Sequence, residues 1–299
     1  MHSLLLIAVA GLAAQFVDGA LGMGYGLTSS TLLIAVGLSP ALASASVHLA
    51  ELGTTAVSGI AHQRFGNVDW PTVRRIAIPG AIGAFAGATF LSSISTAAAK
   101  PIAGGLLFVL GVYVLLRFLI GRAPKRKPGT PGIRMLLPLG MVGGFVDATG
   151  GGGWGPVTTP TLLADGRLAP NRVIGTVNAS EFLVALAASV GFIIGLGTAG
   201  IDFGIVLALL AGGVIAAPIA AWVVRHLNAR ILGVVVGGFI CFTNARLLLG
   251  AMGATSEVVW SVYGVIVAAW ICAVLWVVRI VRRDSSTAPA QELEGASAA

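Results

Sequence analysis

Apolar residues form long runs along this chain, and short polar connections separate these runs. The runs at 98–120, 203–225 and 256–281 each contain more than 20 residues. At about 1.5 Å of rise per residue, a helix of that length crosses a hydrocarbon layer roughly 30 Å thick. The ten-residue segments of alternating polarity that are typical of a membrane β-barrel do not occur. The pattern therefore predicts an all-α polytopic membrane protein.

A glycine-rich motif interrupts the apolar pattern twice. Residues 16–26 read FVDGALGMGYG, and residues 145–155 read FVDATGGGGWG. At nearly the same offset, of 129 to 130 residues, VHLAE at 47–51 falls over VNASE at 177–181. Self-similarity at a fixed period indicates a duplicated structural unit. The sequence therefore predicts two repeats, each of about 130 residues.

The lysines and arginines divide the connections into two classes. One class is basic, and the other, near residues 39, 95, 200 and 253, carries Lys100 as its only lysine or arginine. Basic connections lie on the cytoplasmic side by the positive-inside rule. They contain Arg64, Arg74, Arg75, Arg122, Lys125, Arg126, Lys127, Arg134, Arg167, Arg172, Arg225, Arg230, Arg279, Arg282 and Arg283.

This charge pattern fits three full spans in each repeat only if segments 3–38 and 133–166 enter the membrane and return to the same side. Each would then be a re-entrant hairpin of a longer helix, a glycine break and a short helix. The number of crossings per repeat is odd, so the repeats have inverted topology. The expected helices are 3–21, 27–38, 41–61, 71–93 and 98–120, then 133–148, 157–164, 173–197, 203–225 and 229–249, with an extra C-terminal transmembrane helix at 256–281.

Two alternatives to inverted hairpins stay open. If 27–38 crossed the membrane completely, the repeats would be parallel, and the glycines could also serve only close helix packing. The predicted organisation is repeat 1 at 1–121, a basic cytoplasmic linker at 122–132, repeat 2 at 133–250, the extra helix and a disordered tail at 284–299.

Composition supports the membrane class. Hydrophobic residues make up 57% of the chain and charged residues 10%, whereas soluble domains average about 25% charged residues. The formal net charge of +7 resides in short loops, so no nucleic-acid surface is expected. Cys241 and Cys272 fall in apolar runs, so we expect no disulfide and no metal site. No cofactor is expected either. No lysine or arginine precedes the first apolar run, so a cleaved signal peptide is not expected.

The glycine motifs suggest a site for an anion. Non-helical backbone inside a membrane must be buried in protein or line a watery cavity. A helix that begins there directs free amides and the positive end of its dipole at a ligand. Two such helix starts, one from each repeat, would form a cradle for a small anionic substrate. The expected substrate-binding residues are Gly22, Gly24, Tyr25, Gly26, Thr28, Ser29, Gly151, Gly152, Gly153, Trp154, Thr158, Thr159 and Asn178.

Polar residues follow one stripe of the expected helix 41–61, and Glu51 lies near its middle. An ionisable group inside the bilayer costs about 2.5–3.5 kcal/mol, so it faces a partner or a cavity. Glu51, its repeat mate Glu181 and His48 are therefore candidate proton carriers for coupled transport. The alternative is that both glutamates only brace the hairpins. Two other pairs are expected to be structural: Asp18 and Asp147 as caps of the broken helices, and Arg117 and Arg246 as headgroup contacts.

These motifs together resemble the sulfite exporter TauE/SafE family of bacterial membrane transporters. The resemblance rests on the paired glycine motifs and on GNVDW at 66–70, and it covers about residues 5–281. It implies an ion-gradient-driven transporter of sulfite, sulfoacetate or another organosulfonate in the bacterial cytoplasmic membrane. In the first motif, Met23 and Tyr25 interrupt the glycine run of the family, which leaves the shape of the substrate pocket open.

Three other functions are compatible with a helical membrane protein to different degrees. A passive anion channel would use the same amides without a coupling residue, and a transporter of a different small oxyanion would use the same cradle. An intramembrane enzyme is not expected, because the sequence offers neither a nucleophile paired with a base nor an HExxH motif. The partners are thus a small anion and the lipid bilayer, with the C-terminus cytoplasmic and the N-terminus outside. The sequence does not indicate the oligomeric state.

Overall fold

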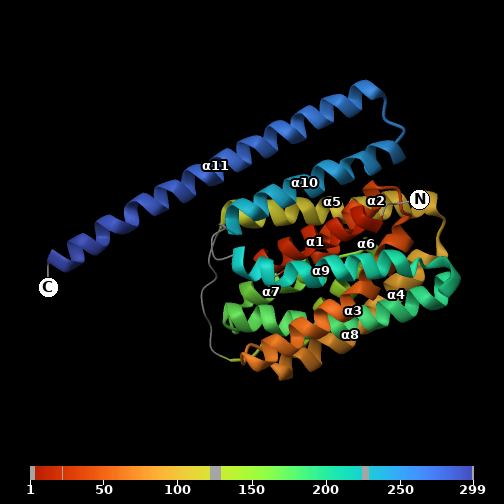
Figure 1. Cartoon of the computed structure of the whole chain (residues 1–299), viewed down its shortest axis with the longest axis horizontal. Helices are drawn as coiled ribbons and strands as arrows, with labels where there is room; N and C mark the ends of the chain where they lie inside the picture. Colours follow the sequence, from red (N-terminus) through yellow and green to blue (C-terminus); the bar gives the residue numbers. More distant parts are fainter. Residues whose placement is uncertain (1–3, 22, 122–128, 224–228, 298–299) are drawn as a thin grey trace.

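The computed structural model describes residues 4–21, 23–121, 129–223 and 229–297. In these residues it contains eleven α-helices and one 3₁₀ turn, and no strand (Figure 1). The helices are α1 Leu4–Leu21, α2 Tyr25–Ala35, α3 Pro40–Arg64, α4 Trp70–Ser93, α5 Thr96–Ile120, α6 Ile133–Gly150, α7 Trp154–Asp165, α8 Pro170–Leu196, α9 Phe203–Val223, α10 Ala229–Ala251 and α11 Ser256–Ser297.

Five of the described helices are long and apolar enough to cross a membrane. They are α4, α5, α8, α10 and α11. Helix α3 has 25 residues and is also long enough to cross a membrane. Its serines, threonines, His48 and Glu51 make it more polar than a typical membrane-spanning helix. Because those polar side chains are mostly buried, α3 avoids exposing them to lipid by packing inside the bundle. The chain is therefore a multi-pass helical membrane protein with a polar helix in its interior.

Both glycine motifs interrupt the helices, and each interruption is shorter than the sequence suggests. The second break consists of Gly151, Gly152 and Gly153, and α7 already begins at Trp154 instead of at residue 157. In the first motif, α2 begins at Tyr25 and not at residue 27. Tyr25 and Trp154 are thus the first helical residues of α2 and α7. The backbone before them contains positive φ angles that favour glycine, 113° at Gly24 and 150° at Gly152.

The two longer helices of the motifs pack in the same way against helices of the other half of the chain. Helix α1 lies on α9, and α6 lies on α4. A Cβ atom on Gly140 would fall 2.6 Å from the carbonyl oxygen of Ile76, and a Cβ atom on Gly11 would clash with that of Leu209. Both glycines let two backbones touch, so the packing of one half is repeated in the other.

Helices α3 and α8 cross the centre of the bundle in opposite directions. Ser58 donates a hydrogen bond to Asn178 at 3.0 Å, and the rings of His48 and Phe192 lie 6.0 Å apart. A higher residue number on α3 thus meets a lower one on α8, which makes the pair antiparallel. Helices α5 and α10 are antiparallel by the same criterion, since Gly104 lies against Leu247, and Arg230 donates to the carbonyl of Leu119 at 3.1 Å.

Basic residues gather at one end of the bundle. There Arg172 of α8 pairs with Asp69 at 3.0 Å, and the same carboxylate caps α4 by accepting from the Thr72 amide at 3.1 Å. Asn171 also donates to Asn67 at 2.8 Å, which joins the two connections. At the opposite end, one cavity is lined by the link before α3, the link before α5 and the link before α9.

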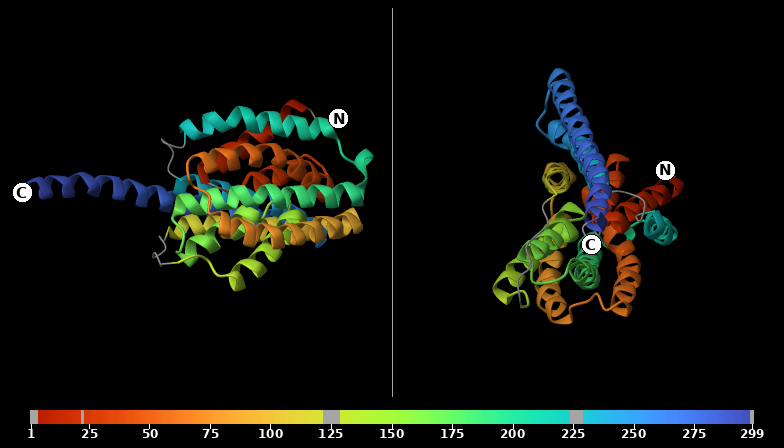
Figure 2. Two further views of the ribbon diagram at one scale, coloured as in Figure 1. Left: turned by 90° about the horizontal axis from the view of Figure 1, so that it is seen from below. Right: turned by 90° about the vertical axis from the view of Figure 1, so that its left-hand side faces the viewer.

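Helix α11 packs on α10 and then extends away from the bundle (Figures 1 and 2). The sequence predicts that the apolar span ends near residue 281 and that a disordered tail follows. Helix α11 extends to Ser297, and the disordered tail stays a prediction. Of the expected linker 122–132, residues 122–128 lie outside the described part of the chain.

Candidate functional site

The two broken helices meet inside the bundle, backbone against backbone, where the first turn of α2 lies on the second glycine break. A Cβ atom on Gly26 would fall 2.8 Å from the Cα atom of Gly152, and one on Gly152 would overlap the backbone of Gly26 and Leu27. The Ser30 hydroxyl donates a hydrogen bond to the carbonyl of Gly151 across this junction. The first turn of α2 therefore rests directly on the break between α6 and α7. Gly22, another expected ligand residue, lies outside the described residues.

Asp147 holds the second break in shape. Its Oδ1 atom accepts hydrogen bonds from the amides of Gly153 at 2.6 Å and of Trp154 at 2.9 Å. Its own carbonyl accepts from Gly151 at 2.7 Å and from Gly152 at 2.9 Å. Two of the amides proposed for an anion are thus bonded to a carboxylate of the protein, which is the geometry of a helix cap.

His48 in turn holds Asp147. Its Nε2 atom lies 3.1 Å from Asp147 Oδ2, and its Nδ1 atom lies 2.8 Å from the carbonyl of Ser44. Both ring nitrogens face oxygen acceptors, which is the bonding pattern of an imidazolium, so the pair is balanced in charge. Ser44 Oγ donates to the Ala148 carbonyl at 2.7 Å, one residue further along. This fully buried network fastens α3 to the end of α6.

The equivalent network of the first repeat is different. Asp18 accepts a hydrogen bond from the Tyr25 amide, as Asp147 does from Trp154. Asn178, the repeat mate of His48, does not hold Asp18 but accepts from Ser58 and donates to the Ile174 carbonyl at 3.1 Å. Within the described part of the chain, the first carboxylate therefore has no histidine partner.

The expected hydroxyl ligands divide into two groups. Ser29 and Thr158, which are repeat mates, each donate at 2.5 Å to the carbonyl of the aromatic residue four positions earlier. Thr28 and Thr159 are buried, and their hydroxyl oxygens have no hydrogen-bond partner in the described structure. Because a buried polar atom without a partner costs about 1–3 kcal/mol, the second group is the better candidate for contact with water or a ligand.

The two aromatic residues occupy equivalent positions in the packing. The Trp154 ring is fully buried against Gly80, and its Nε1 atom donates to the Val177 carbonyl at 3.2 Å. The Tyr25 ring lies against Gly213, and its hydroxyl donates to the Leu209 carbonyl at 3.3 Å. Each ring anchors a short helix to a span of the opposite repeat, and Tyr25 alone of the two also lines a cavity.

That cavity is small and polar, with a volume of about 20 Å³. This is enough space for one water molecule, since a single water needs roughly 10–15 Å³. We name it the carboxyl cavity, because three carboxyl side chains line it. Its walls are Gln15, Asp18, Tyr25, Glu51, Thr54, Thr55, Ser58, Asn178 and Glu181. The structure therefore brings together Glu51, Glu181, Asp18, Tyr25 and Asn178, but it places His48 with Asp147 instead.

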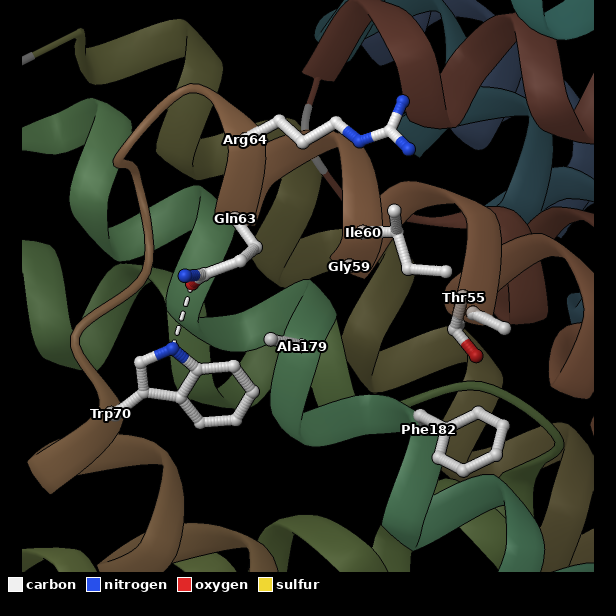
Figure 3. A pocket seen from close by; sticks show the side chains of 9 residues that line it. Thr55, Gly59, Ile60, Gln63, Arg64, Trp70, Ala179 and Phe182 are labelled. Atoms are coloured by element: carbon white, nitrogen blue, oxygen red, sulfur yellow. Dashed lines mark hydrogen bonds between the residues drawn. The ribbon is translucent and has the colours of Figure 1, made fainter.

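A second hollow, larger and mostly apolar, shares Thr55 with the carboxyl cavity, and Figure 3 shows its lining. It has a volume of about 460 Å³ and is lined by α3, α8 and the first residue of α4. At one end Trp70 donates from its indole nitrogen to Gln63 at 2.7 Å. Thr55 lines both hollows, so the apolar groove ends next to the carboxyl cavity.

Sequence reasoning missed several of these residues. Gln15 and Thr54 line the carboxyl cavity, while Gln63 and Trp70 line the groove. Gln15 precedes Asp18 by three residues and thus shares its helix face, a signal that the sequence did contain. Among the described residues no group of three or more His, Cys, Asp or Glu side chains is arranged to hold a metal ion. Cys241 is buried and Cys272 exposed, and neither forms a disulfide.

Comparison with known proteins gives two matches. The model of the family described as "Sulfite exporter TauE/SafE" matches residues 7–247. A protein of Bacillus subtilis (strain 168), described as "Probable membrane transporter protein YtnM", is 50% identical over 279 residues, which is 93% of each chain. No solved structure matches the chain significantly.

Proposed function

Because this chain belongs to the sulfite exporter TauE/SafE family of membrane transporters, we propose that it moves a small sulfur-containing anion across the bacterial cytoplasmic membrane. The anion is sulfite, sulfoacetate or another organosulfonate. The observation that carries the proposal is the meeting of two broken helices, one from each half of the chain, inside the bundle. Non-helical backbone at such a place is a common substrate-binding element of secondary transporters.

The proposal includes repeats of inverted topology. The repeat mates α3 and α8 run antiparallel, and so do the repeat mates α5 and α10. A twofold axis that relates antiparallel helices must lie perpendicular to them, which is in the plane of the membrane. An axis along the membrane normal would relate parallel helices. These pairings support inverted repeats over parallel ones.

The proposal also includes re-entrant hairpins. Gly53 and Thr54 of α3 contact Leu210 and Gly213 in the same order, so α3 runs parallel to α9. Leu4 and Gly11 of α1 contact Gly204 and Leu209 in the same order, so α1 also runs parallel to α9. Two consecutive long helices with one direction require α2 to return between them. This supports a hairpin that enters and leaves at the same side.

In the proposed transport cycle the anion binds where the glycine breaks meet. The side chains with buried, unpartnered hydroxyls, Thr28 and Thr159, belong to the two helices that begin there. The breaks touch in this conformation, so loading would require the two hairpins to separate. Glu51 and Glu181, from the two repeats, line the adjacent carboxyl cavity and couple this movement to an ion gradient.

The orientation follows from the basic residues. Arg64, Arg134, Arg172 and Arg230 belong to connections at one end of the bundle, which we assign to the cytoplasm. The C-terminus then lies in the cytoplasm and the N-terminus outside.

A binding experiment tests the substrate assignment. A ligand that binds the folded protein raises its melting temperature, by an amount set by the ratio of ligand concentration to Kd. We expect sulfite, sulfoacetate or another organosulfonate to raise the melting temperature of the purified protein, and phosphate to leave it unchanged. A shift with phosphate and none with any sulfur anion would assign a different oxyanion.

Transport into liposomes then separates a carrier from a channel. We expect the anion identified by binding to accumulate against its gradient when a pH gradient is imposed. We expect Glu51→Gln to abolish this accumulation. Uptake that follows the membrane potential alone, with Glu51→Gln equal to the wild type, would indicate a passive channel.

A further inference from the structure

The carboxyl cavity contains three acidic side chains from three different helices. Asp18 comes from α1, Glu51 from α3 and Glu181 from α8. The remaining lining residues are uncharged amides, hydroxyls and a tyrosine, and among the described residues no lysine, arginine or histidine lines the cavity. An acidic cavity inside a protein that carries anions needs a counter-charge, because three carboxylates at close quarters repel one another.

Glu51 shows that hydrogen bonds within the described structure do not satisfy every polar atom in the wall of this cavity. The residue is only 2% exposed, and its Oε2 atom has no hydrogen-bond partner in the described structure. A charged oxygen buried in this way is strongly destabilising, whereas a protonated carboxyl group or a bound species removes the cost. An unpartnered buried oxygen thus lies in the wall of a cavity that has room for a water-sized species.

Other charges near the cavity do not supply the missing positive charge. Asp147 of α6 acts on Glu51 and Glu181 electrostatically, but as a further negative group. The imidazole of His48 is bonded to Asp147 at 3.1 Å and balances that carboxylate. Of the lining residues that the structure describes, Tyr25 of α2 is the one other titratable side chain, and the contact residues Leu209, Leu210 and Gly213 of α9 carry no charge.

We propose that the carboxyl cavity is the proton-binding site of the transporter, and that Asp18 belongs to it together with Glu51 and Glu181. The inference rests on the proposed transport of an anion and names the coupling ion and its site. Protons from bulk water add to carboxylate oxygens of the cavity and are released from them on the other side of the membrane. The arrangement favours protons over a metal cation, because the described acidic side chains do not form a metal-ligand cluster.

Gly26 connects this cavity to the junction of the glycine breaks. A Cβ atom on Gly26 would fall 2.8 Å from Glu51 Oε1 and equally 2.8 Å from the Cα atom of Gly152. The carboxyl group of Glu51 therefore touches the same backbone that faces the second break. An anion that approaches this junction is repelled by an ionised cavity and accepted by a protonated one. Proton binding thus becomes a condition for anion binding, which is the physical basis of coupling.

Asp18 adds a mechanical consequence. Its carboxylate accepts from the amide of Tyr25 at the start of α2, and this bond weakens when the carboxylate takes up a proton. Asp147, which His48 holds, does not share this freedom. The α1/α2 hairpin is therefore the one that responds to protons, while the α6/α7 hairpin stays fixed.

Infrared difference spectroscopy tests the proton site without any substrate. The full-length protein in phosphatidylethanolamine and phosphatidylglycerol vesicles is moved from acidic to alkaline buffer, and the C=O stretch of buried protonated carboxyl groups is followed. We expect Asp18→Asn, Glu51→Gln and Glu181→Gln each to reduce this band, because each removes one of three coupled carboxyl groups. Asp202→Asn, which replaces an exposed carboxylate at the start of α9, should leave the band unchanged.

The outcomes test the proton site and the proposed substrate separately. A band that is the same in Asp18→Asn and Glu181→Gln as in the wild type overturns the proton site. If sodium removes the band and choline does not, the proton site is also overturned, because the cavity would then bind a metal cation. If the variants reduce the band but none of the sulfur anions raises the melting temperature, the proton site stands and the proposed substrate fails. If Asp18→Asn aggregates, the infrared band of Glu181→Gln alone tests the proton site.

Discussion

At the scale of single residues, each of the two glycine motifs contains one aspartate, and the two aspartates have different surroundings. Asp147 is bonded to two backbone amides and to His48, whereas Asp18 is bonded to the amide of Tyr25 and faces a cavity with two glutamates. The difference arises at the repeat mates His48 and Asn178, since a neutral amide cannot neutralise a carboxylate. Of these two aligned aspartates, Asp147 is a fixed anchor and Asp18 lines a cavity.

The first prediction concerns this anchor. His48→Ala leaves the buried Asp147 carboxylate without its counter-charge, and breaking a buried pair in this way costs about 3–5 kcal/mol. We expect a large decrease in the melting temperature of the purified protein. The double variant His48→Ala/Asp147→Asn also lacks the carboxylate charge, so part of the lost stability should be recovered.

Asn178→Ala is the matched control. It removes hydrogen bonds to Ser58 and Ile174 but leaves no charge unpaired, so its cost should stay at about 1 kcal/mol, the usual value for a neutral hydrogen bond. Equal losses for His48→Ala and Asn178→Ala would show that the ion pair contributes nothing special.

The spacing of polar residues on residues 41–61 indicated that Glu51 and His48 share a helix face. It did not indicate that the two side chains serve different partners, His48 on α6 and Glu51 in the cavity beside α8. Residues on one stripe point in similar directions, but their partners lie on helices that are distant in the sequence. Which helix lies opposite is a property of the assembled bundle.

At the scale of helices, glycines decide how closely the elements approach. On α6, Gly140 and Gly144 lie against the backbone of α4, where a Cβ atom on Gly140 would fall 2.9 Å from Pro79 and one on Gly144 would overlap the Gly80 carbonyl. In a membrane, association depends on such close packing because the lipid tails are as apolar as the side chains. These glycines are therefore requirements of the interface between the two halves of the chain.

The second prediction follows from this contact. Gly144→Ala places a methyl group into the backbone of α4, and overpacking of this kind costs about 1–3 kcal/mol. Gly105→Ala is the control, since its Cβ atom would meet Leu248 at an ordinary 3.6 Å. There the gain in helix propensity, about 0.5–1 kcal/mol, should leave the protein equally or more stable. Melting temperatures in one detergent compare the two, and equal values would contradict a tight α4/α6 contact.

The positions of the helices were largely predictable, because apolar length and capping residues are local signals. Ser39 and Asp69, for example, accept from amides of the helices that they precede. The exact starts of α2 and α7 were not predictable. A glycine run shows where the backbone is free to leave the helix, but contacts with the other break decide where the helix resumes.

At the scale of the whole molecule, the arrangement has a consequence for topology. Phe65 follows the end of α3 and Thr198 follows the end of α8, which are equivalent places in the two repeats. Both residues are exposed. With inverted repeats they lie on opposite sides of the membrane, and with parallel repeats they lie on the same side.

Cysteine labelling measures this third prediction. In a background with Cys241→Ala and Cys272→Ala, we expect Phe65→Cys to react with a membrane-impermeant maleimide only after the membrane is opened. Thr198→Cys should react in intact cells. Reaction of both from the same side would contradict inverted topology and would remove the basis for two facing helix starts.

The sequence by itself determined the membrane class, the duplication, the two helix breaks and the polar residues that the lipid cannot accommodate. Each of these is written in local chemistry: apolar length, a repeated motif, glycine's freedom to adopt positive φ, and the cost of a charge in hydrocarbon. Only the tertiary structure decided which carboxylate is neutralised by His48 and which three share a cavity. Those outcomes depend on which helices cross, and a pairing across more than 100 residues, such as Ser58 with Asn178, is set by the packing of the whole bundle.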